Sequence, residues 1–161
     1  MSEEERNVVT PEQVPVADSI VARFGDALRT DDRDGYEGYV VSVERLTDVA
    51  TVLRDELGYD YLSSVTGVDY FDEGKIEVVY HAYQTSGGPA LNFKVQVDRE
   101  NPIIPSVDGI WKAADWHERE SFDLFGINYE GHPDLRRILL PNDWNGYPLR
   151  KDFVTPEFYN G

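Results

Sequence analysis

Residues 91–98 alternate strictly between apolar and polar side chains, and this pattern constrains the fold more than any other feature of the sequence. The apolar residues are Leu91, Phe93, Val95 and Val97. The polar residues are Asn92, Lys94, Gln96 and Asp98. Because successive side chains of a strand point to opposite faces, this strand has one apolar face and one solvated face. The sequence therefore predicts a sheet that is wet on one side and covered on the other.

Two further strand-like segments precede this one, at residues 60–70 and 75–83. Asp72-Glu73-Gly74 is a natural tight turn between them, and Ser86-Gly87-Gly88-Pro89 is a looser turn before residue 90. Successive hairpins imply a largely antiparallel sheet, to which the β-branched segment 39–43 adds a strand.

Helical spacing of apolar residues predicts one helix over residues 16–28 and a second over 46–57, with Gly58 as its C-terminal cap. Ser106 is expected to cap a turn over 107–114. Asp115 and Glu118 have the spacing of a capping box for a further helix that ends at Gly126. These elements predict a two-layer α+β fold, with a mixed, mostly antiparallel sheet, helices on one face and an extended C-terminal arm.

The arm, residues 127–161, shows no sustained period and contains four prolines. It is too apolar for plain disorder, because these side chains favour burial: Leu135, Ile138, Leu139, Leu140, Trp144, Leu149 and Phe153. We therefore expect a disordered N-terminus over 1–12, an α+β domain over 13–126, and an interaction arm over 127–161 that is buried against another chain.

Composition excludes several classes of function. The chain has no cysteine, which rules out disulfides, thiolate zinc sites and cysteine-ligated iron–sulfur clusters on it. Its net charge of −16 disfavours nucleic acid and anionic lipid as partners. No apolar run has the roughly 18–20 residues of a spanning helix, so we expect a cytoplasmic location and only indirect membrane contact.

No enzymatic motif stands out. The segment His117–Ser121 lacks the second histidine of a zinc helix, and no glycine spacing fits a phosphate or dinucleotide. Glu118, Glu120 and Asp123 do not converge on one helix face, so a cap and charge pairing is favoured over acid–base chemistry. Arg136, Arg137, Arg150 and Lys151 instead give the arm a basic, aromatic-rich character that is typical of an interface.

A long motif runs through the last third of the chain. It comprises Trp116–Ile127, Tyr129–Pro141, Trp144, Gly146 and Pro148–Phe153. In order and spacing this motif resembles the signature of the C-subunit family of proton-pumping NADH:quinone oxidoreductase, also called respiratory complex I or NDH-1. Upstream, residues 66–70 and 79–81 resemble weaker motifs of that family, so the likeness covers about residues 40–155.

The resemblance implies a non-catalytic structural and assembly subunit of the peripheral, hydrophilic part of the complex, which braces the subunits that form the quinone site. On that basis the chain carries no catalytic residue, metal or cofactor of its own. The complex would use FMN, iron–sulfur clusters, NADH and quinone, and would act as a translocase. The partners would be its cluster-bearing and quinone-site subunits, on the cytoplasmic side of the cell membrane.

By position, the resemblance carries a set of partner-binding and structural residues onto this chain. They are Trp116, Glu118, Arg119, Glu120, Asp123, Gly126, Gly131, His132, Pro133, Asp134, Leu135, Arg136, Arg137, Trp144, Pro148, Leu149, Arg150, Lys151 and Asp152. Tyr147 stands where many members have His, and Asn142 and Asn145 replace common acids.

Three alternatives stay open. Residues 110–116 and 155–159 are also similar to the cyanobacterial and plastid form of this family, the J subunit, whose complex takes electrons from ferredoxin. A related membrane-bound hydrogenase could contain the same module. A free-standing hydrolase could use Glu118 and Glu120.

Overall fold

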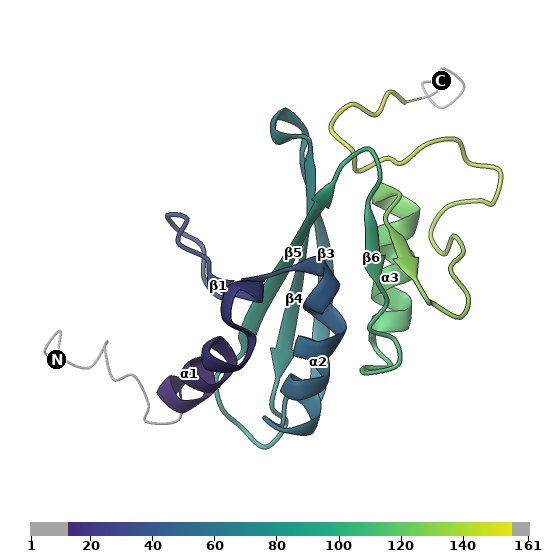
Figure 1. The fold of residues 1–161 in the computed structure, drawn as a ribbon. Coiled ribbons are helices and arrows are strands. Elements are labelled where there is room, and N and C mark those ends of the chain that lie inside the picture. The colour runs from purple at the N-terminus through teal and green to yellow at the C-terminus, as the bar shows by residue number, and fades with distance from the viewer. Residues whose placement is uncertain (1–12, 156–161) are drawn as a thin grey trace, which may run out of the picture.

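A five-stranded sheet forms the centre of the computed structural model, which describes residues 13–155 and the side chains of residues 19–155 (Figure 1). Its strands are β1 (Leu28–Thr30), β2 (Tyr39–Val41), β3 (Tyr61–Tyr70), β4 (Lys75–Tyr83) and β5 (Leu91–Asp98), in the order β1-β2-β5-β4-β3. The β2–β5 pair is parallel and the other pairs are antiparallel. The expected mixed, mostly antiparallel sheet is confirmed. The N-terminus expected to be disordered, residues 1–12, lies outside the described residues.

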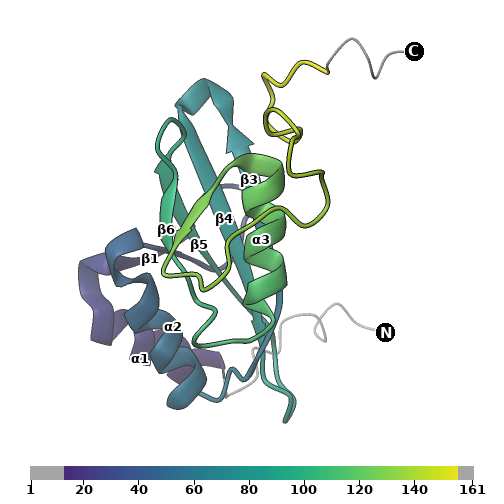
Figure 2. The same ribbon diagram turned by 90° about the vertical axis from the view of Figure 1, so that its right-hand side faces the viewer.

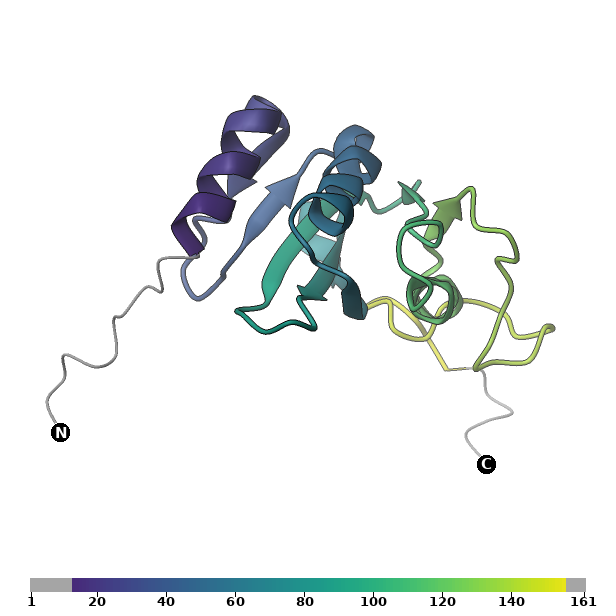
Figure 3. The ribbon, with the colours of Figure 1, turned by 90° about the horizontal axis from the view of Figure 1, so that it is seen from below.

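Helices cover one side of this sheet. They are α1 (Gln13–Phe24), α2 (Leu46–Asp55) and α3 (Ala114–Phe125), with short 3-10 turns η2 (Gly25–Ala27), η3 (Val43–Arg45) and η4 (Phe71–Glu73). Figure 3 shows α1 and α2 on one side of the sheet and α3 beside its β3 end. No helix in the described part of the chain is long and apolar enough to cross a membrane.

The apolar face predicted for residues 91–98 forms part of the core. Phe93 and Val95 are fully buried, and Leu91 and Val97 pack against the buried cluster. Tyr80 of β4 stacks on Phe93 with ring centroids 4.8 Å apart. The sheet therefore presents a continuous apolar surface to the helices, as the alternation predicts.

Helix α2 follows its predicted pattern. Leu46, Val49, Ala50 and Leu53 are buried. Gly58 has a φ of +78°, and the next N–H, that of Tyr59, donates to Leu53 O at 2.9 Å. Helices commonly end at a residue in the left-handed conformation, after which a backbone N–H donates back to a carbonyl of the last turn. Glycine adopts this conformation without steric cost.

Two predicted boundaries are wrong. The first helix ends at Phe24, because Gly25 takes a φ of +53°, and Leu28 pairs with Val41 as part of a strand. The capping box does not form: α3 begins at Ala114, and its N-cap residue, Ala113, makes no side-chain cap. The turn capped by Ser106 does form, since the Asp108 N–H donates to Ser106 Oγ at 3.1 Å.

Besides β1, two short strands were not predicted. Strand β6 (Ile103–Pro105) pairs in parallel with β7 (Asn128–Glu130), which lies inside the stretch expected to be extended. Each has only three residues, too few for a period to show. The described residues that follow, 131–155, contain no helix or strand. They are called the C-terminal segment below.

Candidate functional site

The C-terminal segment is fastened to α3 along its length rather than standing free of the domain. Figure 2 shows it crossing over α3, and Figure 1 shows most of it on the side of α3 away from α1 and α2. Its contacts involve many of the residues of the long sequence motif, and these contacts define the candidate site.

Asp123 is the main attachment point. Its side chain is fully buried, and its Oδ2 accepts the backbone N–H groups of Ile138, Leu139 and Leu140 at 3.1, 2.7 and 2.9 Å. Its Oδ1 accepts Arg137 Nη1 at 2.7 Å. Burial alone would raise the pKa of Asp123, but Arg137 and the three N–H groups outweigh it, so the pKa is lowered. A buried carboxylate thus holds one turn of the segment by its main chain.

Arginine side chains donate hydrogen bonds to backbone carbonyl oxygens of the C-terminal segment and of α3. Arg119 donates to the carbonyl oxygens of Arg136 and Arg137 at 3.2 and 3.3 Å. Arg137 donates from Nη2 to Gly146 O at 3.1 Å, and Arg150 donates to Phe125 O at 2.6 Å. Charged donors to backbone oxygens form strong hydrogen bonds, so these side chains are structural within this chain.

The end of the segment is joined to the sheet. Arg99 pairs with Asp69 at 2.7 Å and with Asp152 at 2.6 Å, and the Lys151 N–H donates to Asp69 Oδ2 at 2.8 Å. The Arg99 guanidinium is the main reason that the pKa of Asp69 is lowered. Helix α3, strand β3 and the C-terminal segment therefore form one connected unit.

Aromatic rings fill the space beneath the segment. Tyr147 lies against Gly126, which ends α3 with a φ of +77°, and a Cβ at Gly126 would come within 2.7 Å of that ring. The guanidinium groups of Arg137 and Arg150 lie 5.3 and 5.7 Å from the Tyr147 ring centre. Trp144 stacks with Phe153. Tyr147 thus has a packing role here.

His132 anchors the start of the segment. Its Nδ1 accepts the Asp134 N–H at 3.0 Å, and its Nε2 lies 3.0 Å from Asp115 Oδ1. Asp108 lies near the same point, so three potential metal ligands gather there. With Nδ1 occupied as an acceptor, a neutral ring carries its proton on Nε2 and donates toward Asp115, which leaves no lone pair for a metal.

Glu118, Glu120 and Asp123, the three α3 residues considered for acid–base chemistry, have different surroundings. Glu118 is fully buried and accepts the Val107 N–H at 3.1 Å, whereas Glu120 is exposed. Asp123 is buried and paired with Arg137, as described above. Glu118 and Glu120 therefore do not face a common cleft.

Several residues of the expected set point to solvent. Trp116 and Leu149 are 60% and 51% exposed, and two residues outside that set, Leu139 and Val154, are 58% and 83% exposed. Gly131, Pro133 and Lys151 are exposed, Leu135 and Pro148 are partly buried, and Asp134 pairs with Arg136 at the surface. The motif thus contains polar side chains that fasten the segment and a few apolar side chains that remain uncovered.

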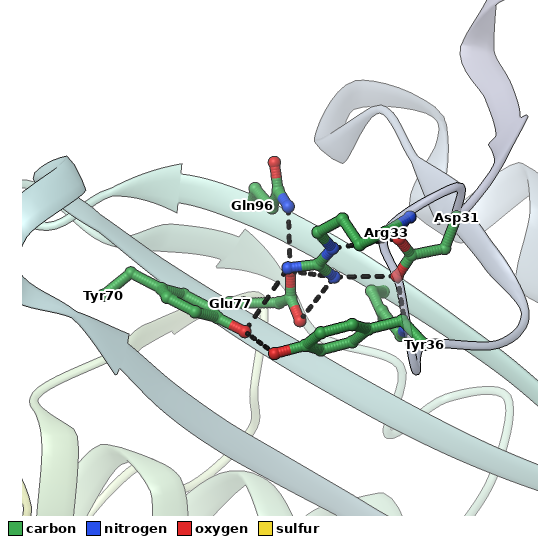
Figure 4. A network of polar contacts seen from close by, with 7 residues as sticks. Asp31, Arg33, Tyr36, Tyr70, Glu77 and Gln96 are labelled. Atoms are coloured by element: carbon green, nitrogen blue, oxygen red, sulfur yellow. Dashed lines mark hydrogen bonds and ion pairs between the residues drawn. The ribbon is translucent and has the colours of Figure 1, made fainter.

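A second polar cluster lies on the opposite face of the sheet, and sequence patterns offered little sign of it. Arg33 donates to Asp31 at 2.7 Å and to Glu77 at 3.0 Å, and its guanidinium lies 4.0 Å from the Tyr36 ring centre (Figure 4). Lys94 pairs with Asp31 as well. The available signal was the pair Glu77 and Lys94, two opposite charges on the polar face of adjacent strands.

Comparisons with known proteins agree on one family. The model of the family described as respiratory-chain NADH dehydrogenase, 30 Kd subunit, matches residues 39–159. The C subunit of NADH-quinone oxidoreductase from Chlorobium phaeobacteroides is 40% identical over 149 residues, which cover 89% of this chain and 90% of that protein. The same subunit from Chloroherpeton thalassium is 45% identical over 148 residues, covering 88% of this chain but 61% of that protein. This chain thus spans less than two thirds of the length of the Chloroherpeton relative.

Solved structures show the same fold. A trypsin-resistant fragment of Nqo5 superimposes with a TM-score of 0.62 at 30% identity, covering 77% of this chain and 99% of the fragment. A chain of the membrane-bound sulfane sulfur reductase, an archaeal respiratory membrane complex, gives a TM-score of 0.76 at 24% identity and covers 91% of this chain and 88% of its own, a likeness of fold alone. Taken with the family match over residues 39–159, these findings show that the chain belongs to the respiratory-chain NADH dehydrogenase 30 Kd subunit family.

Proposed function

We propose that this chain is a structural subunit of the peripheral part of an NADH:quinone oxidoreductase, and that the outer surface of α3 and the C-terminal segment binds its neighbouring subunits. The neighbours would carry the flavin and the iron–sulfur clusters and form the quinone site. The chain itself would hold no cofactor and no catalytic residue, and would lie on the cytoplasmic side of the membrane through its partners.

One observation carries this proposal: apolar side chains remain exposed on a segment that is rigidly fastened from beneath. Leu139 and Leu149 of the segment, and Trp116 of the adjoining α3, are each more than half exposed. The Leu139 N–H is held by the buried Asp123 carboxylate, and the Leu149 N–H donates to Leu124 O. A segment fixed before binding loses little conformational entropy on binding, so its exposed side chains suit a protein interface. Large exposed apolar and aromatic groups are frequent anchors at such interfaces.

A groove next to Leu149 extends this surface. It is lined by Thr66 and Gly67 of β3, by His117 and Leu124 of α3, and by Leu149 itself. Partner side chains could enter the groove while the exposed residues pack around it. The chain contributes no cysteine, so any cluster near this surface would belong to a partner.

Co-purification tests the proposal directly. A tagged full-length chain, expressed in its source cell and recovered from detergent-solubilised membranes, is expected to bring with it flavin- and cluster-bearing proteins with their visible absorbance. The purified chain alone is expected to be colourless. Recovery of the tagged chain without any such protein would disprove the proposal.

A matched pair of variants locates the surface. Leu139→Asp is expected to abolish co-purification with an unchanged unfolding temperature, because residue 139 is fastened only through its main chain. Val21→Asp, at an exposed apolar residue of α1, is expected to leave co-purification intact. Equal loss in both variants, or in neither, would contradict the assignment of the surface.

A further inference from the structure

Glu118 is a buried carboxyl group without an ion-pair partner. Its side chain is fully buried between α3 and the turn after β6. Its Oε2 accepts the Val107 N–H at 3.1 Å, and its Oε1 is hydrogen-bonded to Ser106 Oγ. Within residues 19–155 no lysine, arginine or histidine forms an ion pair with it. The adjacent Arg119 instead donates to carbonyl oxygens of the C-terminal segment. A buried charge with no counter-charge is costly.

The groups that face Glu118 make ionisation less favourable still. They are Tyr80 from β4, Tyr129 from β7, Asp108 from the turn, and Asp115 from α3 itself. Burial raises the pKa values of both tyrosines, so they stay neutral, while the two aspartates add negative charge. Burial, assisted by Asp108 and Asp115, raises the pKa of Glu118 to about 7, against the opposing effect of the Ser106 and Val107 hydrogen bonds.

The hydrogen bonds at Glu118 suit either protonation state. A protonated carboxyl donates from Oε1 to Ser106 Oγ and still accepts the Val107 N–H at Oε2. An ionised carboxylate needs the Ser106 hydroxyl as a donor, so this single bond reverses its direction. The contact survives in both states, but only the ionised state places an uncompensated charge in the core.

We propose that Glu118 is a proton-binding switch: the folded chain holds a proton there near neutral pH, and loss of that proton loosens α3 and the C-terminal segment that α3 holds. The connection is direct, because Arg119 and Asp123 lie on the same helix and supply the contacts to residues 136–140. This inference goes beyond the proposed function, since it concerns a property of the chain alone.

The sign of the effect follows from linkage. In an opened chain the carboxyl returns to an ordinary pKa near 4.5, below its folded value of about 7. The opened state therefore binds fewer protons, and opening becomes more favourable as the pH rises from about 4.5 to 7 and just above. Between pH 6 and pH 8 the opening equilibrium constant is expected to increase about tenfold.

Amide hydrogen exchange of the full-length chain measures this opening. After correction for the intrinsic pH dependence of exchange, opening at the N–H groups of Ile138, Leu139 and Leu140 is expected to increase about tenfold from pH 6 to pH 8. Glu118→Gln should abolish the increase. Glu130→Gln, at an exposed carboxylate of β7, should retain it. A tenfold increase that persists in Glu118→Gln would overturn the proposal.

A second measurement does not require a variant to fold. The carboxyl carbon of Glu118 in the isotopically labelled wild-type chain is expected to titrate by NMR with a midpoint near 7. A midpoint at or below the ordinary value of about 4.5 would overturn the proposal. Both measurements use the isolated chain, so their outcome is independent of whether partners are found by co-purification.

Discussion

The ring of Phe125 in α3 lies against Gly67 of β3 so closely that a Cβ atom at residue 67 would stand 2.8 Å from the ring. This approach lets α3 lie along the edge strand of the sheet, where Ser121 also donates to Val65 O. A side chain at residue 67 would push the helix outward. The absence of a side chain there therefore determines how α3, and everything fastened to it, lies on the sheet.

Gly67→Ala tests this contact. We expect the variant to lower the free energy of unfolding by about 1–3 kcal/mol, because the Phe125 ring and strand β3 are both packed and cannot move apart freely. Gly109→Ala is a suitable control, since no atom lies within 4 Å of its added Cβ and its φ needs no glycine. Urea unfolding monitored by circular dichroism would measure both. Equal stability of the two variants would show that α3 can shift at no cost.

Asp123→Asn should release the C-terminal segment. The amide offers one acceptor oxygen in place of two and leaves Arg137 without its counter-charge in a mostly buried position, so we expect a loss of about 3 kcal/mol or more. Limited proteolysis should then cut within residues 131–155 before the rest of the domain. Asp134→Asn, in the exposed pair with Arg136, should change neither stability nor the cleavage pattern.

Acid should unfold the chain through carboxylates whose pKa values are lowered in the folded state. Asp31, Asp69 and Asp123 share this property, so their stabilising effect is complete above the unfolded pKa of about 3.9 and is lost as the pH falls below it. Glu118, whose pKa is raised in the folded state, instead lowers the stability as the pH rises. The free energy of unfolding is therefore expected to be greatest at about pH 5.

Urea midpoints between pH 2 and pH 8 would define this profile. The decline below pH 4 should be shallower in Asp123→Asn than in the wild type, because one linked proton is removed. An identical slope in the two proteins would mean that Asp123 does not carry the lowered pKa.

Arg33→Ala should destabilise the opposite face of the sheet. It leaves Glu77 with Gln96 as its remaining partner and removes the guanidinium that stacks on Tyr36, so we expect a loss of about 2 kcal/mol, moderated by the partial exposure of Arg33. Arg29→Ala, at an exposed residue of β1, serves as the control. Thermal unfolding would compare the two, and similar unfolding temperatures would exclude a structural role for this cluster.

The sequence predicted those parts of the fold that have a clear period. The strand over 91–98, the two strands that precede it and α2 follow directly from alternation, turn residues and helical spacing. Strands β1, β6 and β7 were missed because three residues cannot show a period. The capping box was wrong because Glu118 turns into the core, toward Ser106 and Val107, rather than back to Asp115.

The residues of the long motif could be named from the sequence, but their contacts could not. Arg119, Asp123 and Arg137 lie in that motif, and the structure joins them around residues 136–140. Sequence spacing could not show that these side chains bind the main chain of their own segment, because such bonds depend on the path of residues 131–155. That path is set by Gly126, Tyr147 and Trp144, none of which has a periodic signature.

The carboxylate of Asp123 recognises residues 138–140 only through their N–H groups, so it is indifferent to which side chains those residues carry. Stability and partner choice are thereby placed on different atoms of the same three residues. Substitutions at these positions change the side chains that would face a partner subunit and leave the hydrogen bonds to Asp123 intact. In these three residues the main chain therefore keeps the shape of the segment, and the side chains are left open to variation.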